Sequence, residues 1–167
     1  MIIKEILNRR SVREYKPDDV PEEYITEIIK AGQFAPSAHN SKAAEFIVIR
    51  DKKTKNLIFE IAGQEYVKEA PVLIIPVADT EKSYLLAQDL AVVSENMFLQ
   101  AAALGLGTVW KHLHEEWQGP IKKLLNIPDN HTIINIVPVG YPKAHIKPHT
   151  DDEFSKEKIH KEKWGAR

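Results

Sequence analysis

The sequence predicts a single α+β domain in which helices flank a mixed β-sheet. Apolar runs of strand length alternate irregularly with segments of helical periodicity, which is typical of that fold class. The 167 residues are enough for one buried core, no linker rich in proline, glycine or serine divides them, and no internal repeat is visible. We therefore expect residues 1–167 to form one domain.

Two helices, a loop and a strand are predicted in the first fifty residues. Apolar side chains at i, i+3 and i+4 spacing predict a helical turn over residues 3–7. A second helix is expected from Pro21, which suits a first helical turn, to about Gly32. The small and polar segment 35–41 predicts a loop that leads into a strand at residues 45–50. A loop on a rigid strand is a favourable place for a functional site.

The middle of the chain predicts a helix, a buried strand and a long helix. Residues 52–61 predict a helix, and the nearly continuous apolar run 71–78 predicts a central strand in which Pro76 is an irregularity. The predicted helix 84–104 has two apolar stripes, one of large and one of mostly small side chains. This helix is therefore either wrapped by its own chain or shared with a partner subunit.

The last third of the chain predicts two strands, a short helix and a polar arm. A glycine turn leads into a strand at 108–110, a short helix is expected at 119–125, and an apolar strand at 132–139 ends before a Gly-Tyr-Pro turn. Residues 143–167 are rich in lysine and histidine, with isolated apolar side chains. We expect them to form an arm laid over a surface.

Composition narrows the classes of function. Lysine and arginine number 23 against 24 aspartates and glutamates, and the net charge of −1 favours neither nucleic acid nor an anionic membrane as a partner. The absence of cysteine excludes disulfides, thiolate metal sites and a cysteine nucleophile, and it fits a reducing cytoplasm. No signal-peptide pattern opens the chain, and the apolar window 84–110 is too polar for a membrane span. We expect a cytoplasmic protein without a membrane partner.

A basic cluster directly follows the first predicted helical turn. Arg9, Arg10, Ser11 and Arg13 fall within five positions, and guanidinium groups bind phosphate oxygens in a bidentate geometry. The cluster therefore indicates an anion site. The alternative is that the arginines interact with a helix dipole and pair with carboxylates on a solvated face.

Four segments in a fixed order carry a family resemblance. They are Arg-Arg-Ser-x-Arg-x-Tyr at 9–15, Ala-Pro-Ser-x-x-Asn-Ser at 35–41, Gly-Leu-Gly-Thr-x-Trp at 105–110 and Pro-Val-Gly-Tyr-Pro at 138–142. Further landmarks are Gly63-Gln64, Ala70-Pro71, Asp89 and Asn96-Met97. Each motif alone is weakly specific, but their conjunction over residues 2–142 resembles the nitroreductase family of flavoenzymes.

The resemblance implies a nitroreductase-like α+β fold with a mostly antiparallel central sheet, assembled as a homodimer through a long buried interface helix. Two FMN molecules would lie at the subunit interface and would carry a hydride from NADH or NADPH to a small-molecule acceptor. That acceptor would be a nitroaromatic, a quinone or a flavin-like compound, reduced in a ping-pong mechanism. No catalytic side chain is implied, because the cofactor carries the chemistry.

The resemblance also implies which residues hold FMN. Arg9, Arg10 and Ser11 would surround the phosphate and the ribityl chain. Arg13 would lie over the electron-rich edge of the ring, where a cation stabilises the reduced flavin.

Two further implied contacts come from later segments. The loop that contains Pro36, Ser37 and Asn40 would lie along the flavin ring from the partner subunit, with Asn40 bonding the polar edge of the ring. The backbone near His112 and Leu113 would donate an N–H toward flavin N5, the atom that accepts the hydride.

Two departures from the family pattern affect these expectations. Family members commonly follow the loop with Gln-Pro-Trp, whereas this chain has Lys42-Ala43-Ala44, so that space is opened or another residue fills it. We therefore expect tolerance of several acceptors. In the tail, where the family usually places a basic residue to finish the phosphate site, Lys147 and His149 are the candidates. The alternative is a tail whose charges are solvated.

Three other patterns compete with this interpretation. His112-x-His114-Glu115-Glu116 contains zinc-type ligands, Gly105-Leu106-Gly107 is part of a dinucleotide-binding motif, and Ser37 is a potential nucleophile. The first lacks supporting context, the second lacks a third glycine, and the third lacks histidine and aspartate partners, so no metal site is expected. On the same fold, the alternatives are other flavin chemistry, such as reductive dehalogenation or dehydrogenation, and a non-catalytic flavin-binding protein.

Overall fold

A six-stranded sheet forms the centre of the computed structural model, which describes residues 1–166. The strands are β1 (Ala44–Ile49), β2 (Val72–Asp79), β3 (Gly107–Thr108), β4 (Lys111–His112), β5 (His131–Thr132) and β6 (Asn135–Gly140). Their main order is β1-β2-β6-β3, with β4 paired to β6 and β5 to β2. Every pairing between these strands is antiparallel, and an isolated bridge between Ser11 and Thr108 is parallel. The sequence predicts a mixed sheet, but the pairings between the named strands are antiparallel throughout. The connection from β1 to β2, for example, brings the chain back in the opposite direction.

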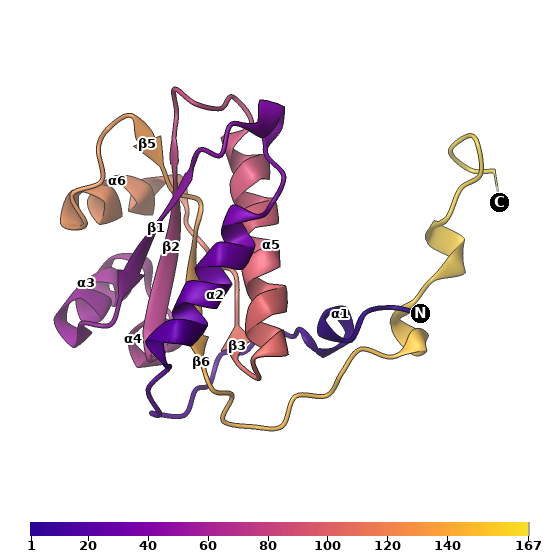
Figure 1. Cartoon of the computed structure of the whole chain (residues 1–167), viewed down its shortest axis with the longest axis horizontal. Helices are drawn as coiled ribbons and strands as arrows, with labels where there is room; N and C mark the ends of the chain where they lie inside the picture. The colour runs from indigo at the N-terminus through magenta and orange to yellow at the C-terminus, as the bar shows by residue number, and fades with distance from the viewer. Residues whose placement is uncertain (167) are drawn as a thin grey trace.

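Helices cover both faces of the sheet (Figure 1). α2 (Glu22–Gln33) and α5 (Leu86–Ala103) lie on one face, and α3 (Lys52–Ala62), α4 (Glu65–Glu69) and α6 (Glu115–Leu124) lie on the other. All residues of β2 are buried. Leu73 and Ile75 pack on the α3 side, whereas Val72 and Ile74 pack on the α5 side. The continuous apolar run in the sequence therefore marks a strand that is covered on both faces.

The structure confirms the predicted long helix and central strand and changes several boundaries. α4 is absent from the prediction because five residues are too few for a periodic pattern. α6 begins at Glu115 rather than at residue 119, since Pro120 is accommodated inside the helix instead of starting it. Pro76 lies where the pairing of β2 passes from β6 to β5, an interruption at which a residue without an N–H is tolerated. The predicted strand 108–110 overlaps the structure only at Thr108 of β3, and the predicted strand 132–139 is divided between β5 and β6.

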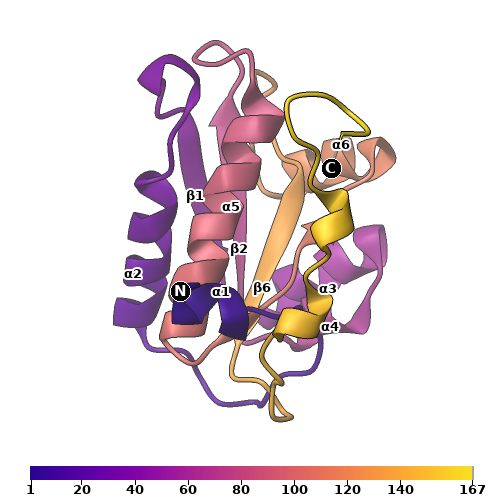
Figure 2. The same ribbon diagram turned by 90° about the vertical axis from the view of Figure 1, so that its right-hand side faces the viewer.

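This chain leaves part of the outer side of α5 exposed. The helix packs on the sheet and on α2, whereas Val92 on its other side is 39% exposed. α1 (Lys4–Asn8) contacts α5, and the arm (residues 143–166) runs out beyond α1 (Figures 1 and 2). Within the arm, Ile146 packs against the core, but Phe154, Ile159 and Trp164 are exposed on this chain. Across residues 1–166, no helix combines the length and hydropathy that crossing a membrane requires.

Candidate functional site

The basic cluster and the start of the arm enclose a hollow of about 340 Å³. One wall is formed by residues 10–14, and the other by Pro142 and residues 144–147. The structure therefore brings Arg10, Arg13 and Lys147 to one place, together with Ser11. We call this space the cationic hollow.

Backbone pairing holds the cationic hollow in shape. The Val12 N–H donates to the Thr108 carbonyl at 2.9 Å, next to the parallel bridge between Ser11 and Thr108. Gly107 permits this approach, because a Cβ at that position would lie 2.5 Å from a Val12 side-chain carbon. On the other side, the Lys143 N–H donates to the Glu14 carbonyl at 3.0 Å. The basic cluster is thus clamped between β3 and the start of the arm.

Arg10 lies at the junction of the cationic hollow and the arm. Its Nη1 lies 2.9 Å from His149 Nδ1 and donates to Glu153 Oε1 at 3.1 Å. The His149 N–H donates to the Leu7 carbonyl at 2.8 Å, which fixes the arm beside α1. His149 therefore neighbours Arg10, although it does not line the hollow itself.

Glu153 contacts both Arg10 and His149, and the sequence analysis did not predict a role for it. Its Oε2 lies 2.7 Å from His149 Nδ1, and this hydrogen bond is the main reason that the pKa of the Glu153 carboxyl lies below its usual range. The Thr150 backbone and the Arg10 charge lower that pKa further. Thr150 and Glu153 form a capping box, and this spacing is the sequence signal that could have drawn attention to Glu153.

Arg9 and Arg13 have different surroundings from Arg10. Arg9 Nε pairs with Glu95 Oε1 of α5 at 3.6 Å, so Arg9 lies outside the cationic hollow. This arrangement matches the alternative of ion pairing on a solvated face. Arg13 lies beside Tyr66, where burial raises the pKa of the Tyr66 hydroxyl and the Arg13 charge opposes that rise.

The backbone N–H groups of His112 and Leu113 point in opposite directions. The Leu113 N–H already donates to the Ile134 carbonyl at 3.0 Å, and His112 pairs with Asn135 in the register of β4 with β6. Because hydrogen-bonded and non-hydrogen-bonded pairs alternate in an antiparallel ladder, the His112 N–H points away from β6. The free backbone donor in this segment is therefore that of His112.

The same edge of the sheet carries the basic cluster. The Thr108 carbonyl points away from β6 and accepts the Val12 N–H. His112 lies four residues after Thr108 and pairs with β6 in the same register, so its backbone groups point to the same side as those of Thr108. The His112 N–H therefore faces the edge on which residues 11–12 lie, about 13 Å farther along at about 3.3 Å per residue. A single elongated ligand could contact both groups.

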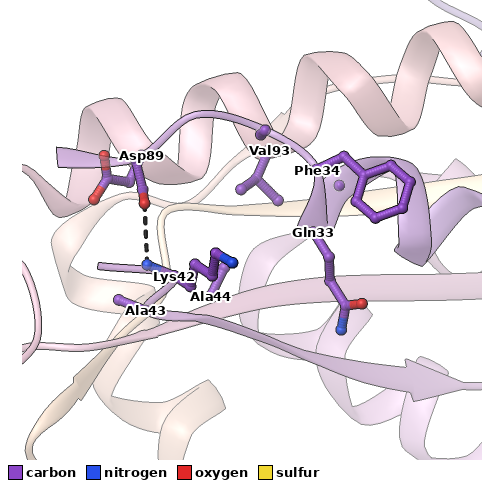
Figure 3. A pocket seen from close by; sticks show the side chains of 10 residues that line it. Gln33, Phe34, Lys42, Ala43, Ala44, Asp89 and Val93 are labelled. Carbon is purple, nitrogen blue, oxygen red and sulfur yellow. Dashed lines mark hydrogen bonds between the residues drawn. The ribbon is translucent and has the colours of Figure 1, made fainter. Parts of the chain in front are cut away.

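The loop of Pro36, Ser37 and Asn40 lies at the other end of α5. The Ala38 N–H donates to Asp89 Oδ1 at 2.9 Å, and the Ser37 hydroxyl accepts the Lys42 N–H at 3.0 Å, the dashed line in Figure 3. The hydroxyl of Ser37 thus has a structural role within the loop. His39, Asn40 and Lys42 have positive φ angles of 51°, 55° and 49°, a conformation that persists only where the surroundings enforce it.

One chain does not bring this loop to the cationic hollow. α5 has 18 residues and is therefore about 27 Å long, with Asp89 in its first turn and Thr108 beyond its last residue. The two groups of predicted site residues lie toward opposite ends of that helix. Pro36 and Asn40 are exposed, and Ser41 Oγ is buried without a hydrogen-bond partner within residues 1–166.

The histidines after β3 form an aromatic cluster. The His112 and His114 rings meet edge to face with centroids 5.0 Å apart, and His114 packs on Trp117 at 4.4 Å. Lys111 Nζ lies 4.1 Å from the centre of the Trp117 ring, and burial lowers the pKa of this amine. Within the described residues, no three histidine, aspartate or glutamate side chains are grouped so that they could hold a metal ion.

Comparison with known proteins identifies the family. The family model described as Nitroreductase family matches residues 6–71 and 55–141. A relative from Methanothermobacter thermautotrophicus, named as a candidate NADH dehydrogenase/NAD(P)H nitroreductase, is 36% identical over 169 residues, which cover 98% of this chain and 87% of the relative. A Bacillus subtilis protein named FMN reductase (NAD(P)H) is 36% identical over 90 residues, 53% of this chain and 36% of that protein. A solved structure of an FMN-dependent nitroreductase from Clostridium difficile is 29% identical, covers 98% of this chain and 100% of that chain, and has a TM-score of 0.92. The chain described here therefore belongs to the nitroreductase family.

Proposed function

We propose that this protein is an FMN-dependent oxidoreductase that uses NADH or NADPH to reduce a quinone, a nitroaromatic or a flavin-like acceptor. The observation that carries the proposal is the cationic hollow, which shares one sheet edge with the free N–H of His112. The named activities of the Bacillus and Clostridium relatives support the choice of FMN. Bound FMN would supply the redox chemistry, taking a hydride from the nicotinamide and passing it to the acceptor in a ping-pong cycle.

The cationic hollow suits the phosphate and ribityl end of FMN. Arg10, Lys147 and the Ser11 hydroxyl can all donate to a phosphate oxygen there. Within residues 1–166, Arg10 donates to Glu153 from Nη1, which also lies beside His149, so the remaining N–H groups of Arg10 are available to a ligand. Arg9 and His149 border this site, and we assign them a supporting role through their charge.

The other end of the proposed site orients the flavin ring. The His112 N–H points outward along the sheet edge and is placed to donate toward N5, while Arg13 supplies a positive charge near the ring. A fixed N–H and a fixed cation need no reorganisation when negative charge develops beside them. The role of these residues is thus electrostatic and positional.

We infer that a second copy of this chain completes the site. Part of the outer side of α5 is exposed, and the loop of Pro36, Ser37 and Asn40 is displaced from the cationic hollow along α5. Three apolar side chains of the arm, Phe154, Ile159 and Trp164, are also exposed on this chain. A second subunit could bury these surfaces and deliver the loop to the flavin ring. Sedimentation of the purified protein at micromolar concentration should show a dimer, and a stable monomer loaded with FMN would contradict this inference.

Flavin binding tests the function directly. The purified protein should be yellow, should bind one FMN per chain and should prefer FMN over riboflavin, because only FMN carries the phosphate. Oxidation of NADH or NADPH with menadione or a nitrofuran should give parallel double-reciprocal plots. Equal affinity for FMN and riboflavin would refute the phosphate site, and intersecting plots would refute the shared site.

A further inference from the structure

Glu153 ties the last part of the arm, residues 150–166, to the rest of the chain. We call these residues the distal arm. Among residues 1–166, the contact between Arg10 and Glu153 is the only hydrogen bond or ion pair that joins the distal arm to residues 1–148. Figure 1 shows the distal arm standing away from the sheet and from the helices that cover it. Its position on this chain therefore depends largely on one carboxylate.

The Glu153 carboxylate also occupies donors that suit a phosphate. Its Oε1 accepts a hydrogen bond from Arg10 Nη1 at 3.1 Å, and its Oε2 lies 2.7 Å from His149 Nδ1. Arg10 lines the cationic hollow, and His149 adjoins Arg10. Carboxylate and phosphate oxygens accept hydrogen bonds from the same guanidinium and imidazole donors. While Glu153 holds Arg10 Nη1 and His149 Nδ1, a ligand phosphate cannot use them.

The contact between Glu153 and Arg10 is weak enough to be displaced. The two side chains are 48% and 40% exposed, and an ion pair so open to water contributes little free energy. Glu153 is held locally as well, because its N–H donates to the Thr150 carbonyl at 3.0 Å. A phosphate monoester carries a charge of about −2 near neutral pH, against −1 for the carboxylate. The phosphate is therefore the stronger partner for Arg10.

We propose that Glu153 competes with the ligand phosphate for Arg10 and His149, and that phosphate binding releases the distal arm. The identity of the ligand as FMN rests on the proposed function, whereas the competition requires only a phosphate group. The coupling is reciprocal, so Glu153 weakens phosphate binding by the same factor by which the phosphate weakens the hold on the distal arm. Glu153 is thus a positioning residue that sets the affinity of the phosphate site.

The first test compares the FMN Kd of the wild type and Glu153→Gln, followed by flavin fluorescence. The amide keeps the size of the side chain and removes its charge, so Glu153→Gln should bind FMN about three- to fivefold more tightly and riboflavin equally well. The matched control is Glu157→Gln, which removes an exposed carboxylate of the same arm that forms no side-chain hydrogen bond or ion pair within residues 1–166. Its FMN Kd should equal that of the wild type.

The second test observes the distal arm itself, through the amide signals of the flavin-free, ¹⁵N-labelled full-length protein. Inorganic phosphate should shift the signals of residues 151–154 toward the positions that they have in Glu153→Gln without phosphate. The same addition should leave these signals in place in Glu153→Gln, because its distal arm is already released. The comparison separates displacement of Glu153 from a general effect of charge on affinity.

Several outcomes would overturn the proposal. Weaker FMN binding by Glu153→Gln would mean that Glu153 orients Arg10 toward the phosphate, and an unchanged FMN Kd would mean that the two anions do not compete. Equal tightening in Glu153→Gln and Glu157→Gln would reduce the effect to the net charge of the arm. Signals of residues 151–154 that ignore inorganic phosphate would show that the distal arm stays in place.

The proposed function fails in a different way, through a lack of preference for FMN over riboflavin. Inorganic phosphate would still move the signals of residues 151–154 in that case, if Glu153 competes with phosphate as proposed. The two failures are therefore distinguishable.

Discussion

Replacing Arg10 with alanine is expected to weaken FMN binding by roughly ten- to a hundredfold. The side chain lines the cationic hollow, and its contacts with His149 and Glu153 all involve Nη1, which leaves its other donors to the ligand. A hydrogen bond to a charged group contributes about 1.5–3 kcal/mol, which is about one to two powers of ten in Kd. Because the Arg10 side chain is 40% exposed, solvent screening favours the lower end of that range.

The assay is a titration of each variant with FMN and with riboflavin, followed by flavin fluorescence. Arg10→Ala should lose affinity for FMN and keep its affinity for riboflavin, which has no phosphate. Arg50→Ala is the matched control, because Arg50 pairs with Asp19 and Glu22 outside the cationic hollow, and its FMN Kd should stay unchanged. An unchanged FMN Kd in folded Arg10→Ala protein would mean that Arg10 serves only to hold the arm.

Three further perturbations probe the arm, the core and the clamp around the basic cluster. His149→Arg should tighten FMN binding at pH 8.5, because a guanidinium is cationic at every working pH and offers more donors to a phosphate; an identical FMN Kd for both proteins would show that the arm does not reach the phosphate. Burial lowers the pKa of Lys55, whose Nζ donates to the Ala70 carbonyl at 2.7 Å, so the unfolded chain binds more protons between the lowered and the ordinary pKa. The free energy of unfolding should therefore rise with pH in that window, and urea unfolding at several pH values should show a flatter rise for Lys55→Met. Gly107→Ala should lower the free energy of unfolding by about 1–3 kcal/mol, since the added Cβ would lie 2.5 Å from Val12; thermal melts should show no such loss for Gly119→Ala, where nothing lies within 4 Å.

The sequence located those helices and strands that are buried on more than one side, because their apolar residues form a long pattern. β2 could be located because all of its residues are buried and the run 71–78 is almost wholly apolar. α5 could be located because its apolar stripes extend over five turns. α4 could not be found in the same way, because five residues contain little more than one helical turn.

The candidate site was only partly accessible from the sequence. Arg10, Ser11 and Arg13 stand together in the chain, so their proximity to one another is a local property. The approach of Lys147 and Glu153 to them is not local, because it depends on the backbone pairing that folds the start of the arm against residues 11–16. A periodic pattern of apolar residues indicates local structure, and it does not indicate a contact between segments more than 130 residues apart in the sequence.

By itself, the sequence determined the α+β class, the central strand, the long helix and the residue types of an anion site. The tertiary structure decided that Arg10 lines the cationic hollow while Arg9 turns to Glu95, because the side chains of neighbouring residues diverge and each pairs with what packs beside it. It also decided that the free backbone donor is His112 and not Leu113, since the register of β4 on β6 alternates bonded and outward-facing pairs. These choices depend on partners that only folding brings together, and no local pattern of residues contains them.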